Sequence, residues 1–140
     1  MIVYPDIFTI EAYENDKHFI TKVIDLLKYL DLEQSVLQRV NNDIFIDPNI
    51  NWIDHLSPGE AQRLNLARVL YHKPKVVFLD ESTVALSESM EEKIMLNLYK
   101  QNSITIVTCG HRESLKKFHQ LQLHINVDGT FELTQLNDDH

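Results

Sequence analysis

The sequence predicts an α/β fold in which a helical part comes first, parallel strands with helices follow, and a β-hairpin ends the chain. An apolar run, residues 76–79, and a second run of β-branched residues, 104–107, are too short for helices and flank a helical pattern. A strand, a helix and a second strand in this order form a parallel crossover unit. Near the end, apolar and polar residues alternate around Asp128 and Gly129, which is typical of a hairpin.

The first part of the chain is expected to be helical. Asp16 can cap a helix that runs to about Leu30, because apolar residues recur on one of its faces. These residues are Phe19, Ile20, Val23, Ile24, Leu27 and Leu30. A second short helix is expected over residues 32–39, and the Asn- and Asp-rich residues 41–51 are expected to form a loop.

The third helix begins with an unusually complete capping pattern. Ser57 can occupy the N-cap, Pro58 the first helical position, and Glu60 the place of the capping-box partner. Pro74 stops the helix near His72. A helix start with unpaired N–H groups and a small polar side chain is an anion site, well suited to phosphate.

The second part alternates strands and helices. Residues 76–79 show no polar alternation, so we expect this strand to be buried on both faces of a parallel sheet. A helix is expected over residues 88–101, residues 104–107 form the next buried strand, and residues 112–119 form a short helix. The apolar positions of the hairpin that follows are Leu121, Leu123, Ile125, Val127, Phe131, Leu133 and Leu136.

Composition narrows the class of protein. The 140 residues suit one modest domain, and 44% hydrophobic residues are enough for a core. A net charge of −8 with scattered Lys and Arg argues against a nucleic-acid partner. The single cysteine, Cys109, cannot form an internal disulfide, which fits a reducing compartment. No apolar run is long enough to span a bilayer.

Four segments of the second half stand in a distinctive order: residues 56–60, residues 76–80 followed by Glu81, residues 84–87, and His111. In this order they resemble the signature motif, the Walker B strand with its carboxylate, the D-loop and the switch histidine of the nucleotide-binding domain of ABC transporters. The resemblance implies a partial P-loop NTPase fold of the ABC type, in which this chain is the C-terminal part of the domain.

The resemblance also divides the chain and narrows the family. Residues 14–72 would form the helical region with the signature motif, and residues 73–140 would carry the other motifs and the hairpin. Residues 2–5, 57–60 and 110–119 resemble subfamily D, the half-transporters of peroxisomes and lysosomes, and its lysosomal, cobalamin-transporting branch most of all. Cobalamin or a fatty acyl compound is the substrate that this implies.

ATP and Mg²⁺ are the cofactors that the resemblance implies. Asp80 would help to hold Mg²⁺ through its water shell, and Glu81 would orient and deprotonate the attacking water. His111 would contact the γ-phosphate and link it to Glu81, while Gly110 lets the chain turn sharply before it. A solvated acidic loop after a strand is the plain alternative, and the agreement among the four motifs speaks against it.

The helix start would contact the nucleotide held by a partner domain. Its nucleotide-binding residues would be Ser57, Pro58, Gly59 and Glu60. Pro58 replaces a more usual glycine and removes one N–H donor. In the D-loop, Val84 and Ser87 stand where the family usually has serine and often aspartate, which puts coupling between sites in doubt.

No P-loop can be read from these residues, because the three glycines, Gly59, Gly110 and Gly129, cannot build Gly-x-x-x-x-Gly-Lys-Ser/Thr. The chain by itself is therefore expected neither to bind ATP tightly nor to hydrolyse it. The implied partners are a second ABC half-transporter or nucleotide-binding domain and a transmembrane domain outside this chain. The implied location is the cytosolic face of a lysosomal, peroxisomal or ER membrane.

Two other functions remain open from the sequence. The first is a soluble ABC-type ATPase, but residues 82–87 differ from the Pro-Thr-Asn-His-Leu-Asp run that translation-type members share. The second is a truncated, non-catalytic ABC module that only pairs with a partner subunit, and the missing P-loop favours it. The transported substrate and the partner subunit cannot be read from these residues.

Overall fold

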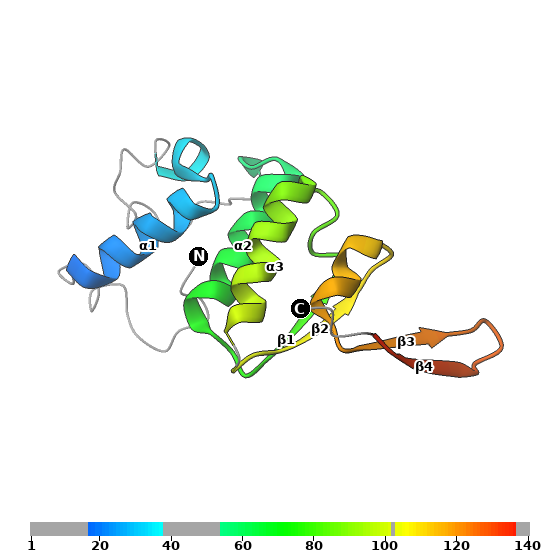
Figure 1. Ribbon diagram of the computed structural model, residues 1–140. Coiled ribbons are helices and arrows are strands. Elements are labelled where there is room, and N and C mark those ends of the chain that lie inside the picture. The colour runs from blue at the N-terminus through cyan, green and yellow to red at the C-terminus, as the bar shows by residue number, and fades with distance from the viewer. Residues whose placement is uncertain (1–16, 38–53, 102, 137–140) are drawn as a thin grey trace.

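The described part of the chain has the expected α/β architecture: helices lie on one side of a short parallel sheet, and a separate hairpin extends from it (Figure 1). The structure is a computed structural model and describes residues 17–37, 54–101 and 103–136. In chain order its elements are α1 (Lys17–Tyr29), η2 (Glu33–Leu37), α2 (Pro58–His72), β1 (Val76–Asp80), α3 (Glu88–Lys100), β2 (Thr105–Cys109), η4 (Glu113–Phe118), β3 (Leu121–Ile125) and β4 (Phe131–Gln135).

The first helix is amphipathic, as its sequence predicts. Its buried face carries Phe19, Val23 and Leu27, one to two turns apart. The expected second helix is a short π-helical segment, η2. Asp16, the end of that second helix and the expected loop over residues 41–51 lie outside the described residues.

The third helix, α2, begins and ends where the sequence predicts. Ser57 is its N-cap, Pro58 stands at its start, and the capping box with Glu60 is present. At the other end Lys73 adopts a left-handed conformation, and its N–H donates to the Val69 carbonyl at 2.9 Å. A left-handed residue of this kind ends the helix and turns the chain toward β1.

The predicted parallel crossover unit is confirmed. Strands β1 and β2 pair in parallel, with Val76 opposite Thr105 and Asp80 opposite Cys109, and α3 connects them. The second strand begins one residue later and ends two residues later than expected. Both strands therefore end at the same edge, where open α/β sheets place their ligands.

The expectation that strand β1 is buried on both faces of a parallel sheet is wrong. Along β1 the side chains of Val77 and Leu79 are 8% and 3% exposed, whereas those of Val76 and Phe78 are 50% and 76% exposed. Helices cover only one face, and β2 is the sole strand neighbour of β1 among the described residues (Figure 1). An unbroken apolar run shows that a strand can be buried on both faces, but not that the second face is covered.

The helices share one hydrophobic core. The ring of Phe19 on α1 meets that of Tyr71 on α2 edge to face, with centroids 6.1 Å apart. Tyr29 Oη donates to the carbonyl of Lys93 at 2.9 Å, and Lys93 Nζ donates to the carbonyl of Tyr29, which ties α1 to α3. The fully buried aliphatic and Met side chains at its centre include Leu27, Leu30, Leu32, Val36, Ala67, Ile94, Met95 and Leu98.

The last part contains a 3₁₀ helix, η4, where a short helix was expected, and then the predicted hairpin. In the antiparallel pair Leu123 lies opposite Leu133 and Ile125 opposite Phe131, so these four side chains share one apolar face. Gly129 has a φ of 85°, a conformation that the turn requires and that glycine adopts without strain.

Candidate functional site

Two acidic residues end strand β1 at the carboxyl edge of the parallel pair. Asp80 is the last strand residue and lies opposite Cys109 on β2. Glu81 follows with a φ of 45°, and its N–H donates to the Cys109 carbonyl at 3.0 Å. A left-handed conformation costs a residue with a Cβ about 1–2 kcal/mol. The backbone is extended at Asp80 and left-handed at Glu81, so the two neighbouring carboxylates need not point in the same direction.

The structure brings His111 close to Glu81. The Nδ1 atom of His111 lies 3.9 Å from Oε1 of Glu81, and both side chains are exposed. This distance is too long for a direct hydrogen bond but is within the range of an ion pair when the imidazole is protonated. An acid–base pair thus lies at the edge of the sheet and is open to solvent.

The start of α2 already binds a negatively charged group, the carboxylate of Glu60. Ser57 donates both from its N–H and from its Oγ to Oε2 of Glu60, each at 2.8 Å, and the Glu60 N–H donates to Ser57 Oγ at 3.3 Å. The backbone and side-chain hydrogen bonds from Ser57 lower the pKa of Glu60. A depressed carboxylate pKa stabilises the folded state above the unfolded pKa, and this contribution is lost as the pH falls through the folded pKa.

The same cap limits which donors an external anion can use. Pro58 has no N–H, and the N–H of Glu60 already donates to Ser57. The Gly59 N–H therefore remains among the first-turn donors of the helix. Among the described residues, no hydrogen bond or ion pair joins Ser57 or Glu60 to the side chains of Asp80, Glu81 or His111.

Gly59 is instead in close contact with the loop that follows β1. A Cβ atom at this position would lie 2.8 Å from the carbonyl oxygen of Ala85, a distance that real Cβ atoms do not tolerate. The family resemblance implies that Gly59 is a nucleotide-binding residue. The structure shows a second requirement, which is the approach of the chain's own backbone.

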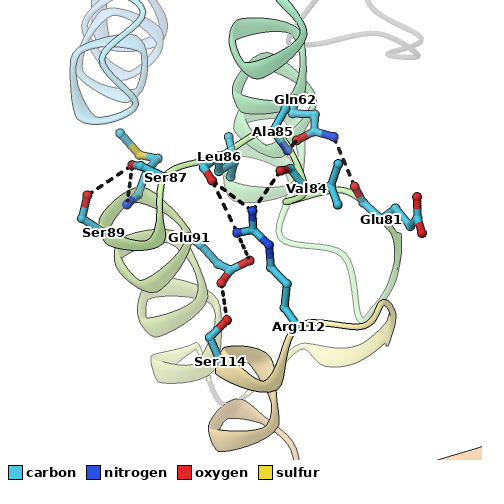
Figure 2. Close-up of polar contacts among 11 residues, drawn as sticks. Gln62, Glu81, Val84, Ala85, Leu86, Ser87, Ser89, Glu91, Arg112 and Ser114 are labelled. Atoms are coloured by element: carbon cyan, nitrogen blue, oxygen red, sulfur yellow. Dashed lines mark hydrogen bonds and ion pairs between the residues drawn. The ribbon is translucent and has the colours of Figure 1, made fainter.

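Sequence reasoning missed Gln62, which joins α2 to this loop. Its Nε2 donates to the Glu81 carbonyl at 3.2 Å, and its Oε1 accepts from the Ala85 N–H at 2.9 Å (Figure 2). The available signal was its spacing. Gln62 lies three residues after Gly59, so both occupy the same face of the helix.

Sequence reasoning also missed Arg112 and its partner, Glu91. Arg112 Nη1 lies 3.0 Å from Oε1 of Glu91, whose side chain is only 2% exposed, and Ser114 Oγ donates to Oε2 at 2.6 Å (Figure 2). Burial alone would raise the pKa of Glu91, but hydrogen bonds from Ser114, Thr83 and Arg112 together keep this pKa below its ordinary value. The sequence signal was again spacing, since Glu91 shares the buried stripe of α3 with Ile94 and Leu98.

The described residues contain neither a cluster of metal-binding side chains nor a helix that could span a membrane. Within residues 17–37, 54–101 and 103–136, no three His, Cys, Asp or Glu side chains gather so that they could bind a metal ion. No helix in this part of the chain has the length and apolar character needed to cross a membrane.

Comparison with known proteins identifies the family. A sequence profile described as "ABC transporter" matches residues 8–84, more than half of the chain. The chain is 35% identical over 137 residues, 96% of its length, to the mouse "Lysosomal cobalamin transporter ABCD4", and 45% identical over 86 residues, 61% of its length, to the human protein of that name. It is 36% identical over 140 residues, 99% of its length, to the human "ATP-binding cassette sub-family D member 3".

These relatives are much longer than the chain, which covers 22%, 14% and 20% of their respective lengths. All three are members of subfamily D, as the sequence motifs predict. The matching profile begins before α2 and ends within the loop after β1, so it covers the start of α2 and both Asp80 and Glu81. This chain belongs to the ABC transporter family and is related to its subfamily D.

Proposed function

We propose that this chain contributes to an ATP-hydrolysing domain that drives a subfamily D transporter. In this function residues 14–72 form the helical region with the signature motif, and residues 73–140 carry the carboxylates, the D-loop and the switch histidine. The observation that supports the proposal most is the pairing of His111 Nδ1 with Glu81 Oε1 at 3.9 Å, at the carboxyl edge of two parallel strands.

Each residue at this edge has a role that its position supports. Asp80, the last residue of β1, is an exposed carboxylate, which fits a Mg²⁺ ion that takes most of its other ligands from water and phosphates. When bound, the ion neutralises charge on the phosphates. Glu81 accepts the proton of the attacking water, and His111 holds a phosphate oxygen and Glu81 in one arrangement.

The first test is the His111→Ala variant. We expect its turnover to fall about a hundredfold, because a positioned acid–base or hydrogen-bonding group is lost at the reacting phosphate. ATP hydrolysis should be measured in a chimaera in which this chain replaces the matching segment of the mouse relative. His124→Ala, a change in the exposed hairpin, is the matched control. Equal rates for the two variants would contradict the proposal.

The helix start is proposed to act on the nucleotide of a second domain, in a dimer of half-transporters. In mixed dimers we expect Gly59→Asp to disable the site built on the partner's Asp80 equivalent, because a carboxylate repels phosphate at the helix start. Gly59→Ala is the matched control, since it brings the same Cβ close to Ala85 without the charge. If Gly59→Asp disables only the site of its own chain, the proposed action across the dimer is wrong.

The proposals for the transported substrate and the membrane rest on the family resemblance and on the relatives, not on contacts in this structure. The mouse and human relatives named as lysosomal cobalamin transporters favour cobalamin, and a fatty acyl compound is the other candidate. The domain would then lie on the cytosolic face of a lysosomal, peroxisomal or ER membrane, attached to a transmembrane domain outside this chain.

A second candidate is a non-catalytic module that pairs with a partner subunit. The exposed apolar side chains favour it, because Phe78 on β1 and Ile125 and Phe131 on the hairpin are 68–76% exposed. ATP hydrolysis by the chimaera distinguishes the two candidates. The chimaera hydrolyses ATP if this chain is part of a catalytic domain and does not if it is only a pairing module.

A further inference from the structure

The D-loop, residues 84–87, is held by an arginine that none of the four motifs contains. Arg112 Nη2 donates to the Val84 carbonyl at 2.9 Å and to the Leu86 carbonyl at 3.3 Å (Figure 2). Its Nη1 donates to Leu86 O at 3.4 Å and to Oε1 of Glu91 at 3.0 Å. The planar guanidinium is thus engaged on two sides, which fixes its orientation as well as its position.

Glu91 anchors this arginine to the core of the domain. The carboxylate is buried on α3, and Ser114 donates to its second oxygen at 2.6 Å. Removal of Arg112 would leave a buried negative charge without its cation, which is strongly unfavourable. The guanidinium therefore has one rigid attachment, on α3, and one attachment to the backbone of a loop.

A second side chain holds the same loop from the opposite direction. Gln62 on α2 contacts the Glu81 carbonyl and the Ala85 N–H, whereas Arg112 contacts the carbonyls of Val84 and Leu86. The backbone from Glu81 to Leu86 is thus cross-linked at alternate points to the signature helix and to the segment after His111. Neither cross-link uses the side chain of a D-loop residue.

We propose that Arg112 is a positioning residue that makes the D-loop and the switch histidine move as one unit. Arg112 follows His111 directly in the chain. A movement of His111 that shifts the backbone therefore also moves Arg112, whose guanidinium donates to the carbonyls of Val84 and Leu86. This inference rests on the proposed function, in which His111 responds to the γ-phosphate. Through Arg112 the backbone of the D-loop is linked to His111, although Val84 has no polar side chain that could make such a link.

Amide hydrogen exchange in the full 140-residue chain tests the cross-link without any need for hydrolysis. We expect Arg112→Leu to speed the exchange of the Val84, Ala85 and Leu86 amides about tenfold or more, because hydrogen bonds from a charged group to the loop are lost. Glu91→Gln, which weakens the anchor of Arg112, is a second test variant, and Glu92→Gln is the matched control. Glu91→Gln should speed exchange in the same loop, whereas Glu92→Gln, which removes an exposed ion pair from α3 to Lys117, should leave it unchanged.

The conservative variant Arg112→Lys decides the matter if Arg112→Leu fails to fold. Lysine keeps a cation for Glu91 but lacks the planar fork that reaches two carbonyls. Faster exchange at residues 84–86 in this variant supports the proposal. Unchanged exchange in Arg112→Lys, or an equal increase in Glu92→Gln, overturns it.

Turnover of the chimaera supplies the functional measurement. For Arg112→Lys we expect kcat to fall about tenfold with KM for ATP unchanged, since the nucleotide contacts remain while the loop loses its position. A normal kcat overturns the coupling. Failure of the proposed function has a different signature: Glu81→Gln would then keep full turnover, while the exchange experiment still decides whether Arg112 fixes the D-loop.

Discussion

Replacing Glu81 by glutamine is expected to abolish ATP hydrolysis while ATP binding survives. The amide has the size of the carboxylate and keeps the left-handed turn at this position, but it cannot accept a proton from water. Loss of a positioned general base lowers turnover about 10²- to 10⁴-fold. The change is confined to the side chain, so the Glu81 carbonyl can still accept from Gln62 on α2, and the helix and its cap at Ser57 should stay intact.

The measurement is steady-state hydrolysis by the chimaera together with equilibrium binding of ATP. Glu132→Gln is the matched control, because it makes the same chemical change on the exposed hairpin, away from the site. Near-normal turnover in Glu81→Gln would remove Glu81 from its proposed role. Loss of ATP binding in the same variant would instead assign Glu81 to the binding of the nucleotide.

The second large effect concerns the 140 residues by themselves, for which we expect no saturable ATP binding at micromolar concentrations. A P-loop supplies backbone N–H groups and a lysine that together neutralise the β- and γ-phosphates, and no glycine pattern here can build one. Two lysines near the end of α2 and within α3, Lys73 and Lys93, have structural roles instead. Lys73 ends α2 in a left-handed conformation, and Lys93 donates to Tyr29 and lies 4.4 Å from the centre of its ring.

Titration of the purified chain with a fluorescent ATP analogue in the presence of Mg²⁺ provides the test. Asp80 and Glu81 place negative charge beside the nucleotide, and Mg²⁺ offsets it only when the phosphates serve as further ligands. Micromolar, saturable binding that Asp80→Asn weakens would show that this edge of the sheet binds nucleotide without a P-loop. The same binding in the wild-type chain and in Asp80→Asn would place a nucleotide elsewhere.

The elements were predictable because each has a local signature. Ser57, Pro58 and Glu60 define the start of α2, and the Asp128–Gly129 turn defines the hairpin, whose strands pair as their alternation predicts. The exposure of Phe78 cannot be read from its own strand, since an apolar run carries no information about the number of layers that pack on it. Burial depends on parts of a fold that a strand does not encode.

The connections around the site were harder to predict than its motifs. Gln62 and Arg112 act on backbone carbonyls and N–H groups of the loop after β1, and a backbone partner leaves no residue type to recognise in a sequence. Glu91 was more accessible to reasoning, because a carboxylate on the buried stripe of a helix needs a partner. The sequence therefore indicates that Glu91 has a partner, but only the structure identifies this partner as Arg112.

The left-handed backbone of Glu81 sets folding and chemistry against each other at a single position. For stability alone, glycine would suit a φ of 45° better, because it lacks the Cβ that makes this conformation unfavourable. A carboxylate at the end of β1 is what water activation would require. If Glu81 has the proposed role, the protein gives up some stability at the residue that activity needs most, and a variant selected only for thermal tolerance would lose its chemistry there first.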